Sequence, residues 1–203
     1  MTSFPTWAQR ARRGLVLLAA AALTGCANFY VDGNTREVPS SELQRREPVH
    51  PVQVLFEFQT KGVANANATS LLKARVLEQV KSSGLFSEVG EAPVAGGALL
   101  GITLNNVPLT DDAFSKGFVT GLTFGLAGSQ VSDGYVCTAR YTPAAGAPAI
   151  VSQARHAIHT TLGSGAAPAS AVKAKNIDEA VTIMTRQVVS NVLNGVSRDA
   201  NFK

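Results

Sequence analysis

Few residues of this chain have a type and spacing that could do chemistry. His156 and His159 are three residues apart, which puts them on opposite faces of a strand and predicts ordinary strand residues, not a metal pair. Asp111 and Asp112 are expected to form a turn or a helix cap, since an adjacent carboxylate pair is a very weak sign of acid–base catalysis. The sequence also lacks a nucleophile elbow, a zinc-protease helix, a phosphate loop and a Cys-x-x-Cys pair. We therefore expect no enzyme, metal site or cofactor.

The clearest chemistry lies at Cys26, which follows Leu23, Thr24 and Gly25. These residues end an apolar run from Leu15 to Leu23, which is too short to span a bilayer because a spanning helix needs about 20 apolar residues. Three arginines precede the run, as in export signals. The four residues resemble the lipobox of bacterial lipoproteins, in which signal peptidase II cuts before the cysteine and the thiol carries a diacylglycerol.

The lipobox resemblance implies a location. Residues 1–25 would be a removable signal peptide, and lipid on Cys26 would hold the chain firmly, since each buried methylene contributes about 0.8 kcal/mol and two or three acyl chains act together. Ala27, in place of aspartate, resembles the outer-membrane sorting class of enterobacterial lipoproteins. We expect a lipoprotein of the outer membrane that faces the periplasm. An ordinary secretory signal, a plain N-terminal anchor and the inner membrane are the alternatives.

Charge argues against a nucleic-acid partner. The chain has 18 basic and 14 acidic residues, and residues 1–25 contain three of the basic ones and none of the acidic ones, which leaves a net charge of +1 after cleavage. No basic patch remains to bind a polyanion. With Cys26 lipidated, Cys137 would be the only thiol, so no intramolecular disulfide is expected, and Cys137 is predicted to be a small buried residue.

The mature chain divides into two parts. Residues 26–51 are polar, contain three prolines and show no apolar periodicity, which predicts a flexible linker behind the lipid. Residues 52–203 are expected to form one periplasmic domain. Alternating or short apolar runs predict strands at 52–59, 99–104, 132–141 and 150–161. Helical spacing with Asn caps predicts helices from about 66 to 83 and from about 177 to 195.

The order strand, helix, strand, strand, strand, helix predicts an α+β fold, a single two-layer domain with an about four-stranded sheet and two helices. This order, with Ser82-Ser83-Gly84-Leu85-Phe86-Ser87 at the helix end and Val89 after it, resembles a group of envelope proteins. The group includes the curli-export and Pel-export lipoproteins, lipoprotein activators of cell-wall synthases and the N-terminal domain of the Tol-system propeller protein. The resemblance implies a scaffold that works by oligomerisation and partner binding, and it transfers no functional residues.

One glycine-rich apolar segment, 114–128, departs from this simple domain. If the segment is a helix, residues four apart form one stripe of large side chains and a second stripe of small ones. If it is a strand, large and small side chains alternate along it. The residues that could mediate self-association or membrane contact are Phe114, Gly117, Phe118, Gly121, Leu122, Phe124, Gly125 and Leu126. The alternative is a glycine-rich connection that covers one end of the core.

Two classes of function remain. The first is a non-catalytic, membrane-anchored lipoprotein that acts as an envelope assembly, scaffold or accessory component, as a homo-oligomer or with another envelope protein. The second is a monomeric periplasmic binding module that holds a small apolar or glycan ligand between sheet and helices. A hydrolase whose polar residues are gathered only by the fold is a distant third.

Overall fold

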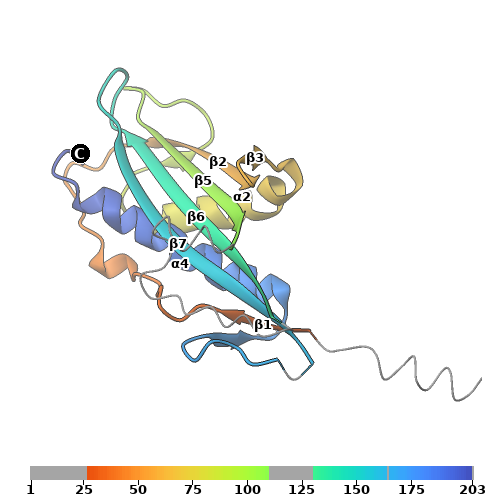
Figure 1. The fold of residues 1–203 in the computed structure, drawn as a ribbon. Helices are drawn as coiled ribbons and strands as arrows, with labels where there is room; N and C mark the ends of the chain where they lie inside the picture. Colours follow the sequence, from red (N-terminus) through yellow and green to blue (C-terminus); the bar gives the residue numbers. More distant parts are fainter. Residues whose placement is uncertain (1–26, 110–129, 164, 203) are drawn as a thin grey trace, which may run out of the picture.

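The computed structural model describes residues 27–109, 130–163 and 165–202, which form a mixed sheet with two long helices (Figure 1). The strands are β1 (Ala27–Val31), β2 (Val52–Thr60), β3 (Val63–Ala64), β4 (Val89–Gly90), β5 (Leu99–Pro108), β6 (Gln130–Thr142), β7 (Ile150–Leu162) and β8 (Val172–Ala174). The helices are η1 (Ser40–Glu42), α2 (Ala66–Ser82) and α4 (Ile177–Arg198). No helix within these ranges has the length and apolar character to cross a membrane.

The sheet has eight strands in the order β3-β2-β5-β6-β7-β1-β8, and β4 pairs with the start of β2. Strands β2 and β5 are parallel, and β5, β6 and β7 are antiparallel neighbours. The predicted four-stranded, two-layer domain is therefore wrong. The four expected strands are the long central ones, β2, β5, β6 and β7, whereas the four additional strands have five residues or fewer. Strands that short show no readable periodicity.

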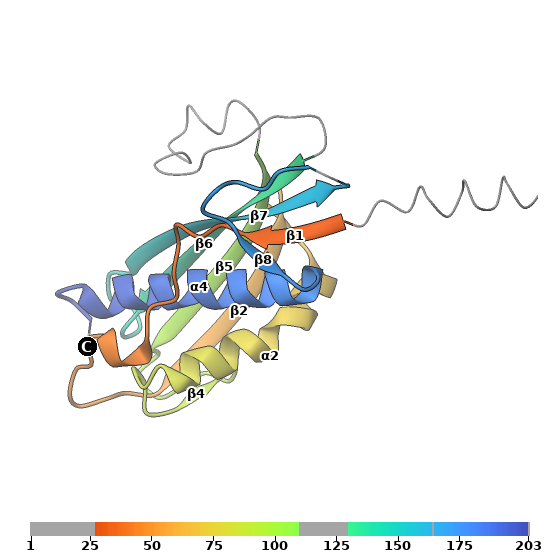
Figure 2. The same ribbon diagram turned by 90° about the horizontal axis from the view of Figure 1, so that it is seen from below.

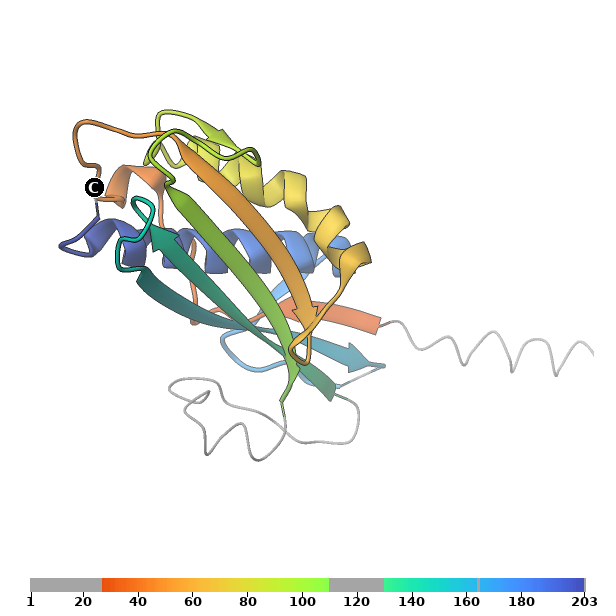
Figure 3. The same cartoon turned by 90° about the horizontal axis from the view of Figure 1, so that it is seen from above.

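Both long helices lie on the same face of the sheet (Figure 3). Helix α2 buries Leu72, Val76 and Val80 against it, and the largest buried residues of α4 include Met184 and Leu193. The helices begin as predicted, because Asn65 Oδ1 accepts a hydrogen bond from the Ala68 amide and Asn176 Oδ1 accepts one from the Glu179 amide. The buried face of β6 carries Tyr135, Cys137, Ala139 and Tyr141, which confirms the predicted burial of Cys137.

Helix α4 does not end at Gly195 but continues to Arg198. A Cβ at Gly195 would collide with the Ser152 hydroxyl of β7. The glycine therefore permits a close approach of helix and sheet, and it does not terminate the helix.

The described part of the predicted linker, residues 27–51, is built into the domain. Strand β1 pairs with β7 on one side and β8 on the other. The chain then crosses α4 as an outer layer (Figure 2), where the Val38 amide donates to Ser190 Oγ (2.9 Å) and the Gln44 amide donates to Ser197 Oγ (3.2 Å). Backbone-to-hydroxyl bonds of this kind need no apolar period, so the sequence pattern did not reveal them.

Candidate functional site

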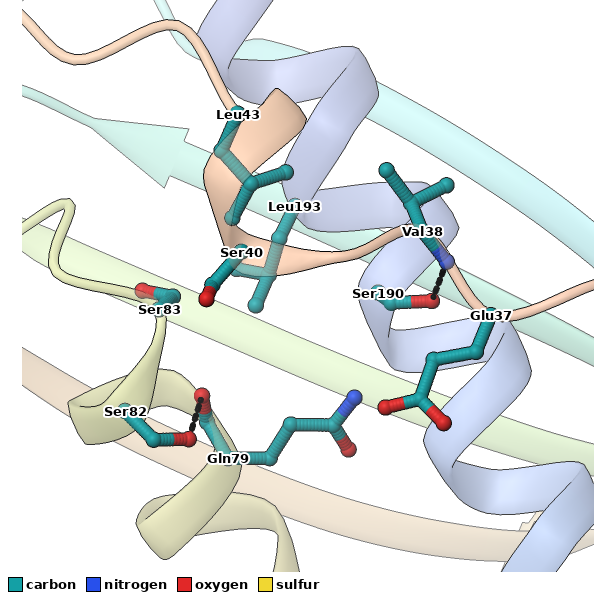
Figure 4. A pocket seen from close by; sticks show the side chains of 9 residues that line it. All are labelled: Glu37, Val38, Ser40, Leu43, Gln79, Ser82, Ser83, Ser190 and Leu193. Carbon is teal, nitrogen blue, oxygen red and sulfur yellow. Dashed lines mark hydrogen bonds between the residues drawn. The ribbon is translucent and has the colours of Figure 1, made fainter.

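A groove runs between α2 and α4, and the segment 37–43 forms one of its walls (Figure 4). The part beside that wall has a volume of about 140 Å³ and is lined by Glu37, Val38, Ser40, Leu43, Gln79, Ser82, Ser83, Ser190 and Leu193. The part farther along the helices has a volume of about 380 Å³ and is lined by Glu37, Arg75, Glu78, Gln79, Ser82, Thr182, Thr185 and Arg186. Three residues line both parts, so the two form one interhelical groove.

The helical repeat explains why polar side chains meet in the groove. Residues three or four apart share a helix face, which brings Arg75, Gln79 and Ser82 together on α2 and Thr182 and Arg186 together on α4. Gln79 Nε2 donates to the Arg186 carbonyl (2.7 Å), and Arg75 Nη1 donates to Thr182 Oγ1 (2.7 Å). These bonds tie the two helices together across the groove.

The charges of the groove largely offset one another. Arg186 pairs with Glu37 at 2.8 Å, and Arg75 pairs with Asp178 at 3.0 Å. All four side chains are substantially exposed, so each pair contributes little to stability, about 0–1 kcal/mol. A groove with balanced charge and many hydroxyl and amide groups suits a neutral polar ligand better than an ion.

Thr185 supplies the least satisfied polar group of the groove. Its side chain is 2% exposed, and Oγ1 has no hydrogen-bond partner among the described parts of the chain. A buried, unsatisfied hydroxyl costs about 1–3 kcal/mol, which a ligand hydroxyl could recover. The described residues of the lining offer hydroxyl, amide and charged groups that can form hydrogen bonds with a ligand.

The histidines flagged by the sequence lie on opposite faces of β7, as their spacing predicts. His156 faces α4: Nδ1 accepts from the Ala157 amide (2.8 Å), and Nε2 donates to Gln187 Oε1 (2.5 Å). His159 Nδ1 lies 2.7 Å from Ser132 Oγ on the neighbouring strand β6. Burial lowers the pKa of both imidazoles, that of His159 to about 4 with a further contribution from His156. Within the described residues, no group of three or more His, Cys, Asp or Glu side chains could hold a metal.

Asp32 is a buried polar residue that sequence reasoning missed. It directly follows β1 and is 2% exposed, and its carboxylate accepts a hydrogen bond from Asn34 Nδ2 (2.9 Å). Burial raises the pKa of Asp32, while the nearby His156 lowers it by a smaller amount. The run Phe29-Tyr30-Val31 just before it was the available signal that this segment is structured.

The remaining predicted site residues lie outside the described residues. They are Leu23, Thr24, Gly25 and Cys26, Asp111 and Asp112, and Phe114, Gly117, Phe118, Gly121, Leu122, Phe124, Gly125 and Leu126. The strands next to them share one end of the sheet. Ala27 at the start of β1 pairs with Leu162 at the end of β7, and Gln130 at the start of β6 pairs with Thr161. We call this the β1–β7 end.

The chain has little detectable similarity to known proteins. It matches no protein-family model and no curated protein. Among solved structures it is similar to two dodecamers of PelC from Paraburkholderia phytofirmans. One, a PelC variant, has a TM-score of 0.35 and 11% identity over 87% of this chain and 100% of that chain. The other has a TM-score of 0.36 and 11% identity over 84% of this chain and 97% of that chain. The predicted likeness to a Pel-export protein is therefore present only as a weak structural resemblance.

Proposed function

We propose that this chain is a non-catalytic lipoprotein, anchored through lipid on Cys26, that serves as an assembly, scaffold or accessory component of the bacterial envelope. The anchor would lie in the outer membrane, with the domain on the periplasmic side. The lipobox-like run Leu23-Thr24-Gly25-Cys26 carries the proposal, and β1 starts at Ala27, one residue after Cys26. Consecutive Cα atoms are about 3.8 Å apart, so lipid on Cys26 would leave no spacer. The domain would then rest directly against the membrane.

The same arrangement supports a role for the segment 114–128 in self-association or membrane contact. Its flanking strands β5 and β6 are neighbours, with Pro108 paired to Asp133, and β6 begins at the β1–β7 end. A segment that leaves and re-enters the sheet there would lie near a lipid on Cys26. It would be available to the membrane or to a neighbouring copy.

The anchor is tested by metabolic labelling with a palmitate analogue. The chain has two cysteines, so Cys137→Ser is a matched control for Cys26→Ser. We expect the label and membrane fractionation to be lost in Cys26→Ser and kept in Cys137→Ser. Label retained by the Cys26→Ser protein would refute the anchor.

Assembly is tested by the native mass of the lipidated protein in mild detergent. A matched variant replaces residues 114–128 with a Gly-Ser linker of equal length, which keeps β5 and β6 connected. A ring that falls to monomers in this variant would support the scaffold function and place its interface in the segment. A monomeric mass for both proteins would refute self-assembly.

A binding module is the second candidate, and the observation that favours it is the interhelical groove with the buried Thr185 hydroxyl. Its ligand would be a small neutral molecule rich in hydroxyl groups, such as a glycan. The test is NMR titration with a panel of soluble oligosaccharides, comparing Thr185→Val with Thr103→Val on the opposite face of the sheet. Saturable shifts around Gln79 that are lost only in Thr185→Val would support binding. Absence of shifts with every sugar would exclude a glycan of this kind.

A further inference from the structure

We propose that the β1–β7 end of the domain is a membrane-contact surface, in which Val131, Leu162 and Ile177 sit among the lipid headgroups. The occupant is the surface of the membrane that would hold Cys26. This inference rests on the proposed lipid anchor and adds to it the face that the domain turns to the bilayer.

Exposed apolar side chains concentrate at this end. The described residues include eight large apolar side chains that are exposed, and three of them lie here: Val131 (60%), Leu162 (52%) and Ile177 (46%). Single exposed apolar residues are ordinary on a protein surface, whereas a group of them marks a contact site. The end of β7, the start of β1 and the start of α4 lie together in the view of Figure 2.

The strand register puts these side chains on one side of the sheet. Residues paired across antiparallel strands share a face, so Val131 lies on the face of its partner Thr160, two residues from Leu162. Ile158, four residues before Leu162 on that same face of β7, pairs with Val31. Val31 and Ile158 are buried beneath the helices, so this is the helix-covered face. Ile177 begins the helix that packs there.

The position of Cys26 selects the membrane as occupant. Ala27 pairs with Leu162, and Cys26 is one residue farther out, so acyl chains on Cys26 would start beside the Leu162 side chain. An anchored domain cannot move this end away from the bilayer without first breaking the β1 pairing. Lys175, whose side chain is 86% exposed, lies two residues before Ile177 and pairs with Glu179 at 3.4 Å, so the proposed contact rests on apolar side chains and not on a cationic group.

The sequence allows a direct test by fluorescence. The chain has one tryptophan, Trp7, which lies in the predicted signal peptide, so the mature protein would contain none. Leu162→Trp and Val151→Trp each introduce a single probe at a site of almost equal exposure, 52% and 54%. Both sites are on β7, and eleven residues at about 3.3 Å per residue separate them by roughly 36 Å. Val151→Trp is therefore a matched control at the far end of the same strand.

The lipidated variants are reconstituted into phosphatidylethanolamine–phosphatidylglycerol vesicles with and without brominated lipid, and flotation is measured on the same samples. We expect the brominated lipid to quench the fluorescence of Leu162→Trp and leave that of Val151→Trp unchanged. Val131→Trp is a second probe of the same surface and should also be quenched. Circular dichroism establishes that each variant is folded.

The outcomes separate the two proposals. Vesicle flotation with no quenching of Leu162→Trp or Val131→Trp would leave the anchor intact and overturn the contact surface. A concentration-dependent blue shift of Leu162→Trp without quenching would indicate a second copy of the chain as occupant and would also overturn it. Equal quenching of Leu162→Trp and Val151→Trp would also overturn the contact surface. Failure of the unaltered lipidated protein to float would overturn the anchor and the contact surface together.

Discussion

Ser190→Ala tests whether the segment 37–43 is held on α4. The Ser190 hydroxyl is 4% exposed, accepts a hydrogen bond from the Val38 amide (2.9 Å) and donates one to the Gln187 carbonyl (2.8 Å). Alanine removes the acceptor and leaves the half-buried Val38 amide without its partner. Because this hydrogen bond fixes one wall of the interhelical groove, the substitution should loosen that wall.

The size of the effect follows from burial. Leaving a buried donor unsatisfied costs about 1–3 kcal/mol, and the partial exposure of Val38 places the expected loss at about 1–2 kcal/mol. For a domain of this size that corresponds to a fall in Tm of roughly 2–8 °C. Urea unfolding followed by circular dichroism measures the free energy of unfolding, and an unchanged m value would show that the compactness of the unfolded chain is unaffected. Hydrogen exchange at the Val38 amide should become faster.

Ser82→Ala is the matched control, since the exposed Ser82 hydroxyl only donates to the Gln79 carbonyl (3.1 Å). Its unfolding free energy should stay within about 0.5 kcal/mol of the parent. If Ser190→Ala also stays within that margin and Val38 exchanges at the parent rate, then this bond does not hold the segment. The description of 37–43 as a fixed groove wall would be refuted.

Three further predictions concern the core and its titratable groups. Met184→Ala should lower the free energy of unfolding, measured in urea, by about 2–5 kcal/mol, because Met184 is 0% exposed on the buried face of α4. Ile177→Ala should cost far less, because Ile177 is 46% exposed. Burial lowers the pKa of His159 from 6.5 to about 4. Between pH 6.5 and about pH 4 the folded protein therefore binds fewer protons than the unfolded chain, so its stability should fall as the pH drops through this range. His159→Gln should flatten this dependence of the urea midpoint on pH. Cys137 is 0% exposed and burial raises its pKa to about 12, so it should react with Ellman's reagent at neutral pH only after unfolding. The assay uses the mature Cys26→Ser chain. Rapid reaction of the folded protein would contradict the burial of Cys137.

The predictable part of the fold is the part with a local pattern. The alternation of 52–59, the apolar run of 99–104 and the helical stripe of α4 each appear within a few residues of sequence, and the structure has the corresponding elements. Strands β1 and β8 have no such pattern. Each is stabilised by partners far along the chain, as when Val31 pairs with both Ile158 and Val172. The run Phe29-Tyr30-Val31 indicates some structure in β1, but the pairing of neither strand can be read from its own residues.

The candidate site was less predictable than the fold. The opposite faces of His156 and His159 follow from a spacing of three, but the partner of His156, Gln187, comes from a helix 31 residues later. The interhelical groove requires residues 37–43 to fold back over α4, where Val38 meets a serine 152 residues away. Pairings at such a distance leave no trace in local composition.

The position of β1 also constrains how the domain would fold if the chain is exported as proposed. The first strand of the sheet joins β7 and β8, which lie more than a hundred residues later, so a chain exported from its N-terminus would deliver β1 first and its partners last. During that interval the edges of β1 would be unpaired, and such edges are prone to aggregation. Contacts this distant in sequence also slow folding. For a chain exported as proposed, the sheet would be completed after translocation, and a periplasmic holdase would have its greatest effect before residues 150–174 have emerged.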